Sequence, residues 1–332
     1  MFKIVAYGVR ENEVDYFKKL NKYHYDVQLE SELLTHDNIE TAKGADAVLL
    51  RANCKADAQN LAKLNEWGIK YVFTRTVGFN HIDLKAAAKY EMKVARVPAY
   101  SPYAVAELAM TLGMMLFRHT ALATDLTRQG NFSVSTATFS GEVHSSTVGI
   151  IGTGRIGATE AQLYSGMGTK VLGYDPYPSD FAKQYVEFVE QDELLAKSDI
   201  VSIHVPYFPG QNDRLIDADF LKKMKPTAVL VNTARTQLAD YPAIIKAITQ
   251  NQIAGFASDV LPDEVEVLGH DFKGNITNEL TKQLVDLYPK VLLTPHIGSY
   301  TSPALTDMIA VSYENFHQVL ETGKTDNDVK LD

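Results

Sequence analysis

The sequence predicts an α/β protein with parallel sheets covered by helices, and three features support this. Short apolar runs alternate with helix-like stretches along nearly the whole chain, a pattern typical of parallel sheets. A glycine-rich turn of the form G-x-G-x-x-G follows one of these runs at 152–157. The 332 residues suggest two domains, at roughly 150 residues each.

In the first hundred residues, we expect strands at the apolar runs and helices between them. The expected strands are KIVAYGV (3–9), DAVLLR (46–51), KYVFTRT (70–76) and KVARVP (93–98). The expected helices are 56–68 and 83–91.

A long helix is expected from Ala104 to Gln129, after Ser101-Pro102. Its first half is apolar nearly all round, which indicates burial on every side. Either a second domain or a second subunit would bury it. We favour a second subunit and therefore a homodimer.

A second series of strands and helices begins at Thr147. Its expected strands are 147–152, 170–175, 199–205, 228–234, 253–260 and 291–297, with helices such as 217–225 and 241–252 between them. We expect 268–289 to form a surface excursion. A final helix over 303–321 has no strand after it, so we expect it to return to the first domain.

Composition argues against several classes of protein. The net charge is −9 and no dense run of Lys or Arg occurs, which argues against a nucleic-acid partner. The most apolar region, 104–117, is too short and too interrupted to span a membrane. Cys54 is the single cysteine; we expect it to be buried, in a reducing compartment such as the cytoplasm. The histidines show no metal-ligand spacing, so we expect no metal.

The motif Gly152-Thr153-Gly154-Arg155-Ile156-Gly157 predicts a dinucleotide site in a Rossmann domain. It follows a strand and opens a helix, the context in which such glycines bring the backbone close to a pyrophosphate at a helix N-terminus. Asp175 ends the next strand, about 20 residues on, where a carboxylate binds ribose hydroxyls and repels a 2′-phosphate. We therefore expect NAD rather than NADP.

Polar residues follow three later strands, where open α/β sheets bind their ligands. They are Arg235, Asp259 with Glu264 beyond it, and His296. Arg can bind a substrate carboxylate bidentately, and His can deliver a proton near neutral pH. A carboxylate favours protonated imidazole, a part suited to Glu264, while Asp259 would orient its neighbours. The set predicts hydride transfer to a 2-oxo acid.

With these residues, the sequence resembles the D-isomer-specific 2-hydroxyacid dehydrogenases, and most closely the D-lactate, D-2-hydroxyisocaproate and D-2-hydroxyglutarate branch. The resemblance covers nearly the whole chain. Its motifs are TRTVGFNHID, VPAYSPYAVAEL, TVGIIGTGRIG, GYDPYP, SDIVSIHVP, VNTAR, SDVLPDE and TPHIGSYT.

The resemblance implies a flavodoxin-like substrate domain of residues 1–99 and 299–332 and an NAD-binding domain of 100–298, with the active site between them. It also implies that the helix after Ser101 forms a dimer interface. The implied catalytic residues are Arg235, Glu264 and His296, with His296 as the acid/base. The implied substrate residues are Arg51, Val77, Gly78, Tyr100 and Tyr300. The implied cofactor residues are Gly152, Gly154, Arg155, Ile156, Gly157, Asp175, Val205, Pro206, Asn212, Thr233, Ala234 and Asp259.

The chain departs from the family pattern at two places. Thr236 and Ala239 replace the Gly and Val of A-R-G-x-L-V-D, and we expect the Cβ of Thr236 to crowd the cofactor or alter the loop. Arg51 stands near a position that is often aromatic in lactate-preferring relatives. It matches the hydroxyglutarate-like pattern and would bind a second carboxylate, unless it points to solvent or pairs with an acid.

The prediction is therefore an NAD-dependent D-2-hydroxyacid dehydrogenase, with pyruvate and D-lactate as the expected pair. D-2-hydroxyglutarate and D-2-hydroxyisocaproate remain open as alternatives. A different class of protein, the NAD(H)-sensing corepressors that share this fold, is the competing hypothesis, and the intact Arg, Glu and His set favours catalysis.

Overall fold

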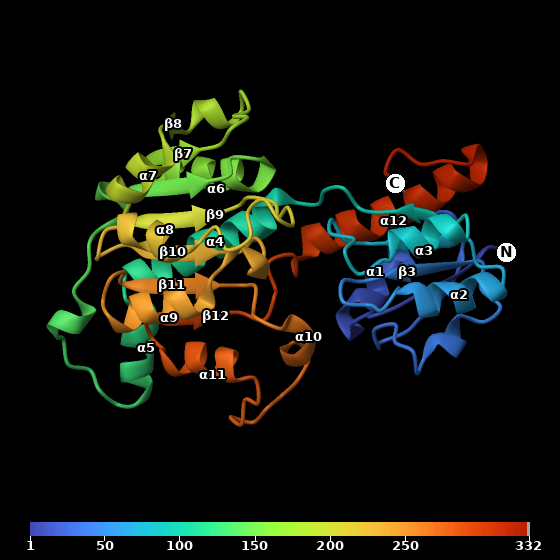
Figure 1. Cartoon of the computed structure of the whole chain (residues 1–332), viewed down its shortest axis with the longest axis horizontal. Helices are drawn as coiled ribbons and strands as arrows, with labels where there is room; N and C mark the ends of the chain where they lie inside the picture. Colours follow the sequence, from blue (N-terminus) through green and yellow to red (C-terminus); the bar gives the residue numbers. More distant parts are fainter. Residues whose placement is uncertain (331–332) are drawn as a thin grey trace. The chain divides into compact units, whose positions relative to one another are not determined.

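The chain folds into two compact units. A computed structural model describes residues 1–330. One unit holds Met1–Ser101 with the C-terminal segment from Tyr300, and the other holds Pro102–Ser299 (Figure 1). The boundaries expected after residues 99 and 298 lie next to these.

The first unit is built on a five-stranded sheet whose pairs are all parallel. Its order, β2-β1-β3-β4-β5, is the flavodoxin-like order. The strands are β1 Lys3–Ala6, β2 Asp26–Leu29, β3 Ala47–Leu50, β4 Tyr71–Thr74 and β5 Lys93–Ala95. The helices are α1 Val14–Leu20, α2 Ala58–Glu66, α3 Leu84–Lys89 and α12 Ser302–Thr322.

Helix α12 confirms the expected return of the chain to the first domain. Its buried residues Ile309, Tyr313 and Phe316 pack with Ile4 and Phe73 on the sheet. Figure 1 shows α12 lying along this unit together with the strands of the N-terminal half. Helices α2 and α3 contribute to a separate core on the same sheet, so both faces are covered.

The second unit is built on a seven-stranded parallel sheet of order β12-β11-β10-β9-β6-β7-β8. Numbered from β6, this is the Rossmann order 3-2-1-4-5-6 with one further strand. The strands are β6 Thr147–Ile151, β7 Lys170–Tyr174, β8 Glu187–Phe188, β9 Ile200–Ile203, β10 Val229–Asn232, β11 Gly255–Ser258 and β12 Val291–Leu293. The helices are α4 Pro102–Phe117, α5 Thr120–Arg128, α6 Arg155–Gly166, α7 Gln191–Lys197, α8 Ala218–Lys223, α9 Tyr241–Thr249, α10 Glu264–Val267 and α11 Glu279–Asp286.

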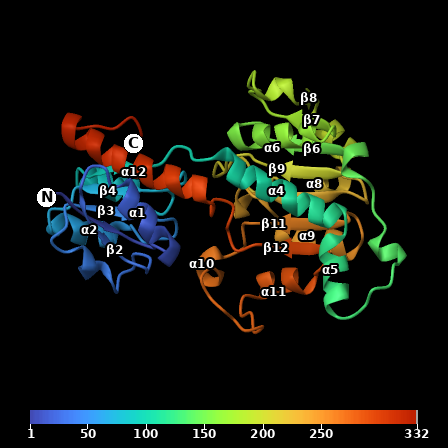
Figure 2. The ribbon, with the colours of Figure 1, turned by 180° about the vertical axis from the view of Figure 1, so that it is seen from behind.

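The expectation of one long helix from Ala104 to Gln129 is wrong. The helix ends at Phe117, and a new one begins at Thr120 after His119, whose φ of 52° is left-handed. Helix α4 packs on α6 and on β9, β10 and β11, and Figure 2 shows it crossing that sheet from behind. One face of α4 is thus buried within its own unit, while Tyr103, Glu107 and Thr111 are exposed, and α5 has only Ala121 buried. The break separates a helix with seven buried residues from one with a single buried residue.

The surface excursion expected over 268–289 is only partly observed. Its second half forms α11, which begins after the capping residue Asn278 and buries Leu284. Strands β2 and β8 were not predicted. Strand β2 (DVQL) is only half-buried and β8 has two residues, so neither shows the apolar run that marks the central strands.

Three smaller expectations can be compared with the structure. Cys54 is buried, as predicted. Over residues 1–330, no helix combines the length and the apolar character needed to cross a membrane. Within the same residues, no cluster of three or more His, Cys, Asp or Glu side chains has the arrangement of a metal site.

Candidate active site

The turn between β6 and α6 has the geometry that a dinucleotide site requires. Gly152 has a φ of +87°, and a Cβ there would lie 2.8 Å from the backbone of His204. A Cβ on Gly157 would lie 2.0 Å from the carbonyl oxygen of Gly152. A Cβ on Gly154, by contrast, would meet nothing within 4 Å. Two glycines are therefore required by packing, and the third leaves open space at the helix N-terminus, where a phosphate group fits.

Asp175 lies directly after β7, beside this turn. Its Oδ2 accepts hydrogen bonds from the backbone N–H of Thr153 at 2.7 Å and from Thr153 Oγ1 at 3.2 Å. Its Oδ1 accepts one from Tyr177 N at 2.8 Å. The carboxylate is thus fixed against the glycine turn.

The other expected cofactor residues lie at the carboxyl ends of strands in the same unit. Arg155 and Ile156 open α6, with Arg155 exposed. After β9, Asn212 donates to the carbonyl of Pro206 at 2.8 Å and so fixes the loop that begins with Val205. The start of this loop is held beside the nucleotide turn by His204, whose backbone N–H donates to Ile151 O at 2.8 Å.

After β10, Thr233 and Ala234 form a tight turn held by Asn232. The side chain of Asn232 accepts from Ala234 N at 3.0 Å and donates to Arg235 O at 3.1 Å. Thr233 Oγ1 is buried and has no hydrogen-bond partner within residues 1–330. A buried hydroxyl of this kind is costly to leave unpaired, and a bound dinucleotide would supply a partner.

His296 and Glu264 come together in space although 32 residues separate them. His296 Nδ1 lies 3.0 Å from Glu264 Oε1 and 3.2 Å from Oε2. An ionised carboxylate only accepts hydrogen bonds, so Nδ1 carries the proton toward Glu264. Glu264 is itself held by Leu261 N, which donates to Oε1 at 3.2 Å. The imidazole is 37% exposed and the carboxylate 17%, so the ring is oriented while one edge stays accessible.

Asp259 is buried behind His296 and fixes the backbone that carries it. Its Oδ1 accepts from Thr294 Oγ1 at 2.6 Å and from Ile297 N at 2.8 Å. Its Oδ2 accepts from Gly298 N at 2.7 Å. Burial raises the pKa of Asp259, an effect opposed by these three hydrogen bonds. Sequence reasoning missed Thr294. It directly follows strand β12, and nothing in the local sequence marks it as a partner of Asp259.

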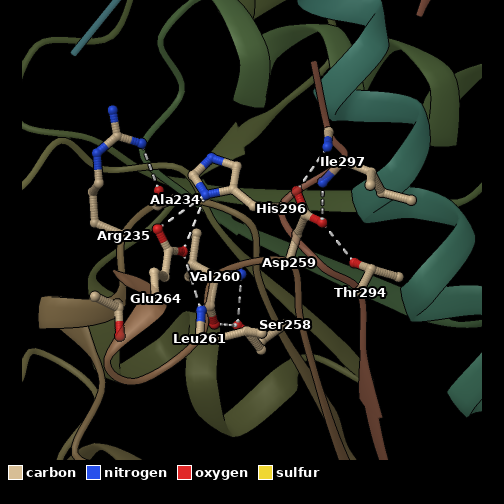
Figure 3. Close-up of polar contacts among 12 residues, drawn as sticks. Ala234, Arg235, Ser258, Asp259, Val260, Leu261, Glu264, Thr294, His296 and Ile297 are labelled. Carbon is tan, nitrogen blue, oxygen red and sulfur yellow. Dashed lines mark hydrogen bonds and ion pairs between the residues drawn. The ribbon is translucent and has the colours of Figure 1, made fainter. Parts of the chain in front are cut away.

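Arg235 lies beside this pair, and Figure 3 shows its side chain to the left of the His296 ring, with the Glu264 carboxylate below the ring. Arg235 is half-buried, and its Nη1 donates to the carbonyl of Ala234 at 2.7 Å. No ion pair involves it within the described part of the chain. A cation, an imidazole and a carboxylate thus gather at the ends of neighbouring strands, as expected.

The expected substrate residues of the first unit lie at the carboxyl edge of its own sheet. Val77 and Gly78 form a turn after β4, in which Thr76 Oγ1 donates to Gly78 O at 2.7 Å and Arg96 Nη1 to Val77 O at 3.0 Å. Tyr100 is half-buried at the end of this unit. The ring of Tyr300 lies under the guanidinium of Arg10, 4.0 Å from its centroid.

Arg51 follows β3 and is half-buried among other arginines. Burial and the nearby charges of Arg10 and Arg75 lower its pKa to about 10. Arg75 is paired with buried Glu13 at 3.1 Å, a bridge that sequence reasoning missed because the two lie 62 residues apart. Arg51 takes part in no ion pair within residues 1–330, and its only side-chain hydrogen bond there is to Gly8 O at 3.5 Å. Among these residues it has no acidic partner.

Comparison with known proteins agrees with this geometry. The family model described as D-isomer specific 2-hydroxyacid dehydrogenase, NAD binding domain, matches residues 110–298. A D-lactate dehydrogenase of Lactiplantibacillus plantarum is 36% identical, covering 99% of this chain and 100% of the relative.

Solved structures are similar over the same length. A D-lactate dehydrogenase of Treponema pallidum has a TM-score of 0.89 at 32% identity, covering 99% of this chain and 100% of that one. An NAD-complexed D-isomer specific 2-hydroxyacid dehydrogenase of Lactobacillus delbrueckii ssp. bulgaricus has a TM-score of 0.85 at 31% identity, covering 98% and 100%. With its Rossmann order, its glycine turn and these relatives, this chain belongs to the D-isomer specific 2-hydroxyacid dehydrogenase family and is an NAD-dependent oxidoreductase.

Proposed function

We propose that the protein reduces pyruvate to D-lactate, reversibly, with Arg235, Glu264 and His296 as its catalytic residues. The observation that carries the proposal is the contact between His296 Nδ1 and Glu264 at 3.0 Å, beside Arg235, which has no carboxylate partner among residues 1–330. Pyruvate is the expected substrate because the relatives that match over the full length include D-lactate dehydrogenases.

Each residue has a distinct task in this proposal. The bound nicotinamide supplies the hydride. Arg235 binds the substrate carboxylate, since guanidinium remains charged and binds carboxylates bidentately. His296 delivers a proton to the carbonyl oxygen from Nε2, and Glu264 stabilises the protonated ring through Nδ1. The dinucleotide is held by Gly152, Gly154, Arg155, Ile156, Gly157, Asp175, Val205, Pro206, Asn212, Thr233, Ala234 and Asp259, and the substrate also by Val77, Gly78, Tyr100 and Tyr300.

Two substitutions test the catalytic roles. His296→Ala is expected to abolish turnover of pyruvate while NADH still binds, measured by quenching of protein fluorescence. Arg235→Lys is expected to raise KM for pyruvate and lower kcat, because the forked donor is lost. Full turnover in either variant would remove the role assigned to that residue. Absence of turnover with every 2-oxo acid in the wild-type protein, despite NADH binding, would favour an NAD(H)-sensing function instead.

A second candidate substrate is a 2-oxo acid with two carboxylates, such as 2-oxoglutarate. The observation that favours it is Arg51, which is half-buried among like charges and has no acidic partner in the described chain. A substrate carboxylate beside Arg51 would offset the burial of its charge. Arg51 follows β3, and Val77 and Gly78 follow β4, its neighbour in the sheet.

Parallel assays decide between the two substrates. NADH oxidation is measured with pyruvate, 2-oxoisocaproate, phenylpyruvate and 2-oxoglutarate, for the wild type, for Arg51→Gln, and for Arg128→Gln as a control at an exposed arginine. If 2-oxoglutarate is preferred and only Arg51→Gln loses that preference, the dicarboxylate is the substrate. If pyruvate or a longer apolar acid is preferred and Arg51→Gln changes nothing, the lactate or hydroxyisocaproate proposal stands.

We also propose that the enzyme is a cytoplasmic homodimer. Phe132, Val134 and Phe139 lie between α5 and β6 and are 79%, 94% and 83% exposed. Three exposed apolar side chains in one short segment favour contact with a second copy. Sedimentation should give a dimer for the wild type, and replacing the three residues with Ser should increase the monomer fraction; an unchanged dimer would exclude this segment from the interface.

A further inference from the structure

We propose that Thr236 and Tyr241 form a hydrogen-bonded bridge that positions Arg235 relative to the Glu264–His296 pair. This inference rests on the proposed role of Arg235. Thr236 directly follows Arg235, and its Oγ1 lies 2.9 Å from the hydroxyl of Tyr241. That hydroxyl donates to the carbonyl of Val260 at 3.1 Å.

The direction of the bridge follows from the number of protons available. A tyrosine hydroxyl has one proton to donate, and here it goes to the carbonyl of Val260, which can only accept. The proton between the two hydroxyls therefore comes from Thr236. The order of donation is Thr236 to Tyr241 to Val260, so each side chain is needed for the chain to be complete.

The bridge ends on the backbone that carries Glu264. Leu261, next to Val260, donates its N–H to Glu264 Oε1 at 3.2 Å, and Glu264 contacts His296. Ser258 lies within hydrogen-bond distance of the same Val260 carbonyl, at 2.6 Å. Figure 3 shows Ser258, Val260, Leu261 and Glu264 in sequence beneath His296. The bridge thus joins the turn that bears Arg235 to the segment that orients the acid/base.

Burial makes the bridge effective. Tyr241 is 5% exposed, and its burial raises the pKa of its hydroxyl, so this hydroxyl remains a proton donor. In a water-poor environment, hydrogen bonds between fixed groups are stronger, and an unpaired group is more costly.

The structure also answers the expectation that a Cβ at residue 236 would disturb the loop. Thr236 begins a short 3-10 turn, Thr236–Leu238, and does not have the positive φ that would require glycine. Where the family pattern has Gly, this chain has a side chain that uses its hydroxyl. Because the Arg235 side chain makes a single hydrogen bond within the described part of the chain, to Ala234, fixing its backbone limits the positions that its guanidinium can reach.

The test compares Thr236→Gly, Thr236→Ser, Tyr241→Phe and the double variant Thr236→Gly/Tyr241→Phe. The control is Tyr313→Phe, which removes a buried hydroxyl that donates to Phe17 O at 3.0 Å in the other unit. For each variant, kcat and KM are measured with pyruvate and with 2-oxoglutarate, together with the Kd of NADH and the melting temperature.

Thr236→Gly and Tyr241→Phe are each expected to lower kcat/KM for the 2-oxo acid about 3- to 10-fold, the effect of one buried hydrogen bond. The Kd of NADH should change less than twofold. Thr236→Ser should retain wild-type activity, and the double variant should lose no more than the worse single variant, because both act through one chain. Tyr313→Phe should lower the melting temperature by about as much as these variants do, but leave kcat/KM unchanged.

Any one of three results would overturn the bridge. Tyr241→Phe could keep the wild-type kcat/KM, the losses could be additive in the double variant, or Thr236→Ser could lose as much as Thr236→Gly. Arg235→Lys distinguishes this failure from that of the proposed function. If Arg235→Lys is impaired and Tyr241→Phe is not, only the bridge fails. If Arg235→Lys is fully active, the role of Arg235 fails and the bridge has no catalytic task.

Discussion

Asp259→Asn offers a sharp test of how the acid/base residue is held. The Asp259 carboxylate accepts three hydrogen bonds, from Thr294, Ile297 and Gly298, at 2.6, 2.8 and 2.7 Å. Asparagine keeps one oxygen and presents an NH₂ group to at least one of these donors, so at least one hydrogen bond is lost. A hydrogen bond to a charged group contributes about 1.5–3 kcal/mol.

The change also removes a buried charge, which offsets part of this loss. Burial raises the pKa of Asp259, so its ionised form is less favourable in the folded protein than in water. We therefore expect a net destabilisation of about 1–2 kcal/mol. Because the three donors flank His296, we expect kcat to fall about 10- to 100-fold, since small displacements of catalytic groups have effects of this size.

The assay measures kcat, the Kd of NADH and the free energy of unfolding. Thr294→Val removes one of the three hydrogen bonds with little change in shape, so its effect on kcat should be the smaller of the two. If Asp259→Asn retains wild-type kcat, or if Thr294→Val is the more damaging change, Asp259 does not position His296.

Three further predictions concern the cofactor turn and a buried histidine. Gly157→Ala should lower the melting temperature or prevent folding, since its Cβ would lie 2.0 Å from a carbonyl oxygen. Gly154→Ala should keep its melting temperature and bind NADH at least 10-fold more weakly; equal melting temperatures of the two variants would contradict this. Asp175→Ala should reduce the preference for NADH over NADPH, and an unchanged ratio of kcat/KM values would show that Asp175 does not discriminate. Burial lowers the pKa of His81 to about 4 from 6.5, so the unfolded state binds the proton first as pH falls. Stability should decrease from pH 6.5 toward pH 4 by at most about 3 kcal/mol. His81→Gln should reduce that decrease, and equal pH profiles in urea unfolding would disprove it.

The sequence by itself determined the parts of this protein that depend on local patterns. Buried parallel strands are continuous apolar runs, so the central strands and the order of strand and helix could be predicted. The glycine turn could be predicted as well, since tight turns and close approaches allow few other residues. Polar residues after successive strands meet at one edge of a parallel sheet, which is why Glu264 and His296 could be paired before their 3.0 Å contact was seen.

Only the tertiary structure decided features that depend on contacts between distant residues. The end of α4 before His119 reflects what each half of that segment packs against, and no proline or glycine marks it. Asp259 was expected to orient its neighbours, but its three donors could not be identified. Two of them are backbone N–H groups, which nearly every residue carries. The sequence showed the substitution at Thr236, but not that its hydroxyl meets that of Tyr241 in the fold. Side-chain partners of this kind are set by the distances between folded segments, which the order of residues along the chain does not contain.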